Sequence, residues 1–162
     1  MGKKFWPIRI LDGLGSKAKY SPFKCNNDSY LYGVRTGLCL YNSPSFSNLC
    51  MKIYTIRDGL PTKLLGTSTN LWQPSDLQTK NYRPVQLYFT FNDIELEGST
   101  LYHAVFEATG YTYSDSSWIG WLLDHPKPVN EGTSLLAIDL GIAPAFILPI
   151  ARPKQGLGAY GL

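Results

Sequence analysis

Three carboxylates lie close together in the middle of the sequence, at Asp93, Glu95 and Glu97. Side chains two positions apart on a strand share one face, so Glu95 and Glu97 could act as a pair. Paired carboxylates hydrolyse glycosidic bonds when they lie about 5 to 9 Å apart across a sugar. Asp93 and Glu95, with nearby carbonyl groups, could instead hold a calcium ion. Solvated side chains beside a turn are the simplest interpretation, and we expect neither a catalytic nor a metal site here.

Histidine and cysteine are scarce, and their spacing predicts neither nucleophilic catalysis nor a zinc site. His103 and His125 have no second histidine or cysteine at ligand spacing. The cysteines, Cys25, Cys39 and Cys50, are odd in number and form no C-x-x-C pair, which argues against a disulfide framework. This usage fits assembly in a reducing cytoplasm. We therefore expect a protein that is not an enzyme and that needs no cofactor.

A glycine-rich segment near the start of the chain reads Asp12-Gly13-Leu14-Gly15-Ser16-Lys17. The spacing G-x-x-x-x-G-K-S/T of a phosphate-binding loop is absent. No helix is predicted directly after the segment, so no helix amino terminus would face a phosphate. We do not expect this segment to bind a nucleotide.

Aromatic residues make up 14% of the chain, and several of them lie in or beside predicted loops. Exposed Trp and Tyr rings stack on sugar faces and anchor protein interfaces. Four of them are candidate carbohydrate or interface residues: Trp72, Tyr111, Tyr113 and Trp118. Core packing is the alternative. Trp118 and Trp121 fall on opposite faces of one predicted strand, so we expect at least one of the two in the core.

The composition is that of a turn-rich all-β protein. Among 162 residues, 17% are charged, 15 are glycine and 11 are proline, which disfavours coiled coils, helical bundles and disordered tails. The formal charge is only +3 and the basic residues are scattered, so no nucleic-acid partner is expected. The most apolar stretch, residues 135–150, contains Asp139 and two prolines and is too short to cross a bilayer. We expect no membrane association.

Alternating apolar and polar residues predict short strands from residue 47 onward, most clearly over 85–91 and 101–109. About eight or nine strands, with turns every 8 to 12 residues, indicate an antiparallel β-sandwich or jelly roll. The two faces expected to meet in its core carry Val85, Leu87, Phe89 and Phe91 on one strand and Tyr102, Ala104 and Phe106 on another.

The two ends of the chain lack this regular alternation. Residues 1–45 contain closely spaced turn signals, and we expect them to form an extended N-terminal arm used in assembly. The sandwich domain is expected over residues 46–151. Residues 152–162 are predicted to form a glycine-rich C-terminal tail.

Residues 47–132 resemble jelly-roll domains of viral particles and of carbohydrate-binding proteins. The motifs that carry the resemblance are Gly59-x-Pro61, Val85-x-Leu87-x-Phe89-x-Phe91 and Leu96-Glu97-Gly98-Ser99-Thr100-x-Tyr102. The resemblance implies a fold and leaves the function open.

Residues 10–19 resemble the amino-terminal segment of structural proteins from tailed-bacteriophage particles. In those proteins the segment serves assembly, which implies assembly roles here for Asp12, Gly13, Gly15 and Ser16. The resemblance implies a non-enzymatic virion protein, such as a capsid decoration, head–neck or tail-associated subunit. Such a protein would assemble in the host cytoplasm and dock on major capsid, neck or tail subunits. It would also form a homo-oligomer, with a trimer as the expected state. The alternative is a carbohydrate-binding sandwich module that attaches to a host glycan.

Overall fold

The computed structural model describes residues 5–8, 20–77, 85–112, 114–122 and 146–154. These residues form strands and one short 3-10 helix, η1 (Pro74–Leu77). The strands are β1 (Phe5–Ile8), β2 (Tyr20–Phe23), β3 (Ser29–Tyr41), β4 (Ser47–Arg57), β5 (Leu60–Thr67), β6 (Val85–Leu96), β7 (Tyr102–Thr109), β8 (Trp118–Leu122) and β9 (Ile147–Pro153). The expected all-β class is confirmed for these parts of the chain.

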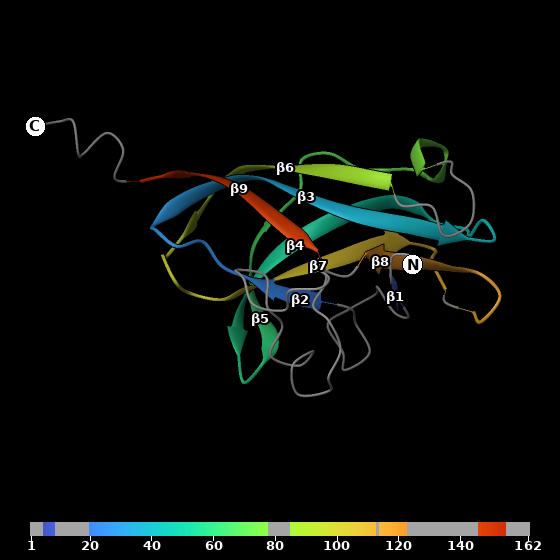
Figure 1. Cartoon of the computed structure of the whole chain (residues 1–162), viewed down its shortest axis with the longest axis horizontal. Helices are drawn as coiled ribbons and strands as arrows, with labels where there is room; N and C mark the ends of the chain where they lie inside the picture. Colours follow the sequence, from blue (N-terminus) through green and yellow to red (C-terminus); the bar gives the residue numbers. More distant parts are fainter. Residues whose placement is uncertain (1–4, 9–19, 78–84, 113, 123–145, 155–162) are drawn as a thin grey trace, which may run out of the picture.

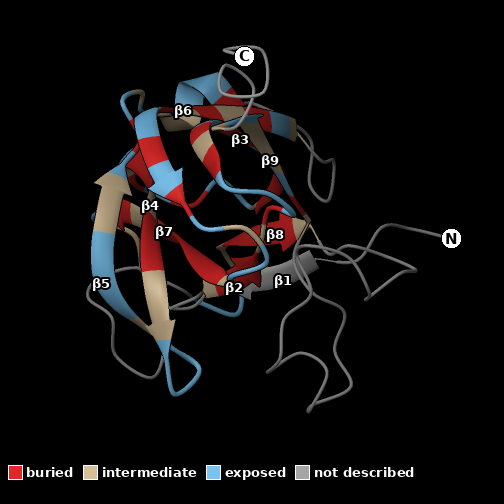
Figure 2. Ribbon diagram, turned by 90° about the vertical axis from the view of Figure 1, so that its left-hand side faces the viewer, coloured by how far each residue is buried: buried red, intermediate tan, exposed pale blue. Residues whose placement is uncertain are grey.

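The strands form two antiparallel sheets that pack face to face as a sandwich (Figures 1 and 2). The first sheet has the order β1-β8-β3-β6, and β9 also pairs with β3. The second sheet has the order β2-β7-β4-β5. β8 and β9 lie one after the other along the same edge of β3, opposite residues 38–41 and 29–36 respectively. The Phe146 amide donates to the Leu122 carbonyl over 2.8 Å, so the end of β8 is joined directly to the start of β9.

The sandwich begins earlier in the chain than expected, because β2 and β3 lie within residues 20–41. β3 is a central strand with paired neighbours on both edges, so the expected arm over residues 1–45 is wrong for this part. Two features hide the period of two in β3. A bulge interrupts the register between Leu31 and Gly33, and the Tyr88 ring fills the space above Gly33. A Cβ atom at Gly33 would overlap the Tyr88 hydroxyl oxygen.

One further expected boundary differs from the structure. Arg152 and Pro153 belong to β9, so the C-terminal tail does not begin at residue 152. Asn92 and Asp93 are residue types that are common in turns, yet β6 continues through them to Leu96. They form a bulge opposite the irregularity in β3, with Asp93 at a φ of 39°. Asn and Asp tolerate this left-handed backbone in bulges as well as in turns, so the sequence signal is the same for both.

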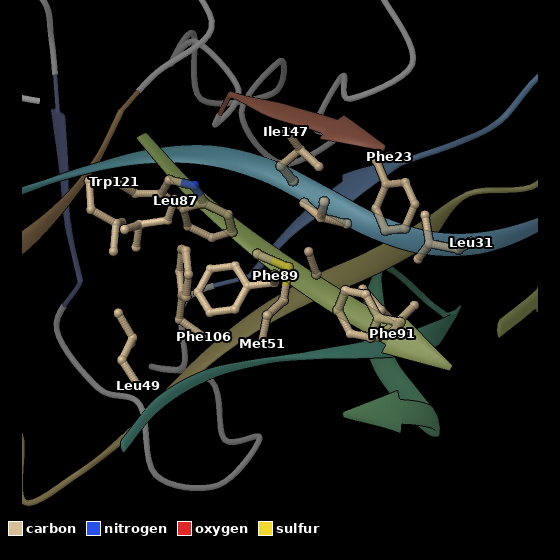
Figure 3. Packing of buried hydrophobic residues seen from close by; sticks show 14 of the residues in the cluster. Phe23, Leu31, Leu49, Met51, Leu87, Phe89, Phe91, Phe106, Trp121 and Ile147 are labelled. Carbon is tan, nitrogen blue, oxygen red and sulfur yellow. The ribbon is translucent and has the colours of Figure 1, made fainter. Parts of the chain in front are cut away.

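The core lies between the two sheets where the sequence pattern placed it. Phe89 of β6 packs on Phe106 of β7 with ring centroids 5.7 Å apart, and Phe106 meets the Trp121 ring edge-on at 4.4 Å (Figure 3). All three side chains are fully buried. The predicted contact between these two strand faces is confirmed, and Trp121 is the tryptophan of its strand that lies in the core.

Candidate functional site

Three loops gather at one end of the sandwich, the right-hand end in Figure 1. They are residues 42–46 between β3 and β4, residues 68–77 after β5, and residues 110–117 between β7 and β8. We call this region the loop end. It contains three of the four aromatic residues singled out in the sequence, Trp72, Tyr111 and Trp118. Tyr113, the fourth, lies outside the described residues.

Trp72 and Tyr111 are half-buried and support the fold. Trp72 exchanges two backbone hydrogen bonds of 2.9 Å with Leu49, and its indole nitrogen donates to the Tyr88 carbonyl over 3.3 Å. The Tyr111 hydroxyl accepts a 3.0 Å hydrogen bond from the Ile119 amide. Both rings also pack against the core. These contacts hold the two rings in fixed positions at the loop end.

Trp118 forms an aromatic stack with Tyr41, a residue that the sequence did not single out. The two rings are 5.2 Å apart and inclined by only 24°, and both side chains are half-buried. Trp118 and Tyr41 face each other across paired strands β8 and β3. The signal that could have revealed Tyr41 is this pairing, which requires the sheet order and is not visible in one sequence.

Polar side chains tie the loops of this end to one another. Asn42 donates to the Ser116 carbonyl over 2.8 Å, and Ser117 returns a bond to the Asn42 carbonyl over 3.2 Å. Asn48 and Gln73 are joined by a side-chain hydrogen bond of 2.7 Å. The loops at 42–46 and 110–117 are therefore cross-linked beside the Trp118–Tyr41 stack, which helps to preorganise it.

The carboxylates near residue 95 lie at the opposite end of the sandwich. Asp93 forms an ion pair with Arg152, and Glu95 forms one with Lys154. Both cations also lie over the Tyr30 ring, at 4.8 and 5.4 Å from its centroid. These contacts bind the end of β9 to β6 through charged pairs at the surface.

An open hollow of about 290 Å³ lies beside these ion pairs. Its walls come from both sheets and combine two leucines with five polar side chains. The leucines are Leu65 and Leu96, and the polar residues are Thr55, Glu95, Glu97, Tyr102 and Lys154. The Tyr102 hydroxyl accepts a 2.8 Å hydrogen bond from the Glu97 amide. Burial raises the pKa of Tyr102, so its hydroxyl keeps its proton.

His103 is buried on the outer face of β7 and has a structural setting. Its Nε2 lies 3.0 Å from the Gly59 carbonyl in the β4–β5 turn, and its ring meets the edge of Tyr20 at 4.5 Å. Burial lowers the pKa of His103, and the Gly59 carbonyl opposes that effect. His103 thus links three segments of the second sheet while it remains neutral.

The remaining candidate chemistry is limited in the parts of the chain that the structure describes. Cys25, Cys39 and Cys50 are buried, and none of them forms a disulfide. No cluster of three or more His, Cys, Asp or Glu side chains there is placed to hold a metal ion. None of the described helices is long and apolar enough to span a membrane. His125 and the expected assembly residues Asp12, Gly13, Gly15 and Ser16 lie outside the described residues.

A scan of protein-family models found no match to this chain, and a search of curated proteins found no similar one.

Proposed function

We propose that this chain is a non-enzymatic structural subunit of a tailed-bacteriophage particle, built on a jelly roll. The observation that carries the proposal is the pairing of the strands. β1 pairs with β8, β2 with β7, β3 with β6, and β4 with β5. Successive pairs alternate between the two sheets.

This pairing is what results when one long hairpin of eight strands is wound into a sandwich. The first strand meets the eighth, the second meets the seventh, and each pair faces the next one across the core. Jelly rolls of this kind recur in viral capsid proteins and in lectins. Within that range, the resemblance of residues 10–19 to phage structural proteins favours the particle subunit.

A subunit that docks on neighbours also needs apolar side chains outside its own core. β5 is the last strand of its sheet (Figure 2). It carries Leu60 and Leu64, which are 48% and 45% exposed. Pro61 and two register shifts make β5 a poor template for another strand. The β5 surface is therefore suited to side-chain docking on a neighbouring subunit, including a second copy in the proposed trimer.

The direct test is immunogold labelling of phage particles that carry the genome encoding this chain. Gold on the head, neck or tail is expected. Protein found only in soluble cell fractions would contradict the proposal. The double variant Leu60→Ser, Leu64→Ser should fold and fail to enter particles. Leu71→Ser, which changes an exposed leucine of the loop end, should enter normally.

Carbohydrate binding at the loop end is a second candidate, favoured by the preorganised Trp118–Tyr41 stack. A half-buried, near-parallel aromatic pair offers a flat surface to the apolar face of a sugar. Trp118→Ala should then abolish binding on a glycan array, while Leu71→Ala at the same end should not. Both variants should keep the circular dichroism spectrum of the wild type. A wild-type chain that binds no glycan on the array would rule this candidate out.

A further inference from the structure

The hollow at the end of the sandwich opposite the loop end has the composition of a small-ligand site. It forms where β4, β5, β6 and β7 meet, and Lys154 also lines it. Both sheets contribute to its walls, so its shape depends on the packed sandwich and not on a single loop. Neither the aromatic residues of the loop end nor the docking leucines Leu60 and Leu64 belong to it.

Two hydroxyl groups in the hollow have a proton to donate. Tyr102 is only 5% exposed, and its oxygen accepts from the Glu97 amide. The Thr55 oxygen accepts from the Lys63 amide over 3.0 Å. No described residue accepts the proton of either hydroxyl, and of the two only the Tyr102 hydroxyl is a buried donor, which is normally satisfied. A ligand with acceptor groups would accept a hydrogen bond from each of the two hydroxyls.

The hollow also offers acceptors and an apolar surface. The Glu97 carboxylate has no hydrogen bond or ion pair with any described residue, whereas Glu95 is paired with Lys154. Leu65 and Leu96 supply apolar contact. A ligand that fits must therefore both donate and accept at neighbouring positions and present a C–H face to the leucines.

We propose that this hollow binds a single neutral sugar ring. Adjacent sugar hydroxyls each donate and accept, which matches Glu97 beside Tyr102 and Thr55. The volume of about 290 Å³ is near the lower limit for small-molecule sites, which suits one ring and not a longer saccharide. The hollow is lined by two carboxylates, of Glu95 and Glu97, and by one ammonium group, of Lys154, and this excess of negative charge disfavours an anionic sugar.

The test is a titration of the full-length ¹⁵N-labelled chain with glucose, galactose, mannose and glucuronate, followed by NMR. At least one neutral hexose should shift the backbone signals of Leu96, Glu97 and Tyr102, with a Kd on the order of 1 mM. Glucuronate should not. The proposal is overturned if no hexose shifts these signals even at hexose concentrations far above this Kd. It is also overturned if the shifts occur at residues of the loop end instead.

Matched variants separate the hollow from the surrounding surface. Glu97→Gln keeps the shape of an exposed side chain and should weaken hexose binding by roughly tenfold. Asp93→Asn removes a nearby carboxylate that does not line the hollow, and the affinity should be unchanged. Equal affinity of Glu97→Gln and the wild type would also overturn the proposal. Neither result depends on whether the chain enters phage particles.

Discussion

The indole nitrogen of Trp121 donates a 2.7 Å hydrogen bond to the hydroxyl oxygen of Thr36, deep between the two sheets. The same hydroxyl donates to the Phe146 carbonyl over 2.6 Å. One threonine therefore satisfies the largest buried side chain of the core and holds the start of β9 beside β3 and β8. A buried polar group costs little only when such partners are present.

Replacing Thr36 with Val should destabilise the sandwich more than the small difference in side-chain volume would suggest. The substitution keeps the side-chain shape but leaves the Trp121 N–H and the Phe146 carbonyl without a partner, which we expect to cost about 1–3 kcal/mol. Thr36→Ser, which keeps the hydroxyl, should recover part of this loss. Thr67→Val, on the exposed strand β5, serves as the control and should change stability by less than about 0.5 kcal/mol. Urea unfolding followed by tryptophan fluorescence measures all three, and an unchanged Thr36→Val midpoint would contradict the assigned role.

Two glycines should respond differently to alanine because different atoms face them. A Cβ at Gly98 would lie 2.8 Å from the backbone carbon of Asn27, which cannot move without disturbing the chain. At Gly33 the neighbour is the end of the Tyr88 side chain, which can rotate away. We expect Gly98→Ala to be the more destabilising, by about 2–3 kcal/mol, and Gly33→Ala to cost about 1 kcal/mol.

The steric explanation at Gly33 can be checked with a double-mutant cycle. In a Tyr88→Ala background the space above Gly33 is empty, so Gly33→Ala should become nearly neutral. An equal cost in both backgrounds, measured by urea unfolding, would show that Tyr88 is not the cause.

Acid should weaken the fold through His103. Its pKa is lowered in the folded state, while in the unfolded chain it is about 6.5. The unfolded state therefore binds the proton first, and stability is lost as the pH falls through the unfolded pKa. The Tyr20 ring and the Gly59 carbonyl face this ring, and neither of these groups carries a negative charge that would stabilise the protonated form.

The measurement is the melting temperature between pH 7.5 and 5.5, a window above the range where most carboxylates titrate. The wild type should melt at a lower temperature at pH 5.5. His103→Gln should lose most of this dependence, while His125→Gln should retain it. If His103→Gln keeps the full pH dependence, another group is responsible.

The sequence predicted those elements whose two faces differ clearly in polarity. β6 and β7 each alternate over several positions, and their apolar faces meet through Phe89 and Phe106 as expected. The full length of β3 was not predicted, because Gly33 and Gly37 have no side chain to show the period and because a bulge shifts the pattern at Tyr32. The space where a side chain would stand is filled from a neighbouring strand at both positions, by Tyr88 at Gly33 and by Leu122 at Gly37.

The candidate sites depend on contacts between distant residues, which a single sequence does not encode in any local pattern. Trp118 was singled out by residue type, but its partner Tyr41 became known only from the pairing of β8 with β3. Of the residues that line the hollow, Glu95 and Glu97 were considered in the sequence because they are close together. Lys154 follows them by almost sixty positions and Thr55 precedes them by about forty, so neither could be grouped with them from the sequence. Spacing in the chain indicates such groups only when the sheet order is already known.

Cys39 should be nearly inert to thiol reagents until the sandwich unfolds. The side chain is 1% exposed, and burial raises its pKa to about 12, against a smaller opposing effect of a backbone hydrogen bond with Gly120. At pH 8 about one molecule in 10⁴ carries the reactive thiolate, compared with about one in four for an ordinary cysteine. Cys25 and Cys50 are slightly more exposed, at 8% and 7%, and should react before Cys39. Labelling with Ellman's reagent, with Cys→Ser variants to assign each thiol, gives the three rates. Fast labelling of Cys39 in the native state, with no parallel loss of structure, would mean that the first sheet opens far more readily than its packing implies.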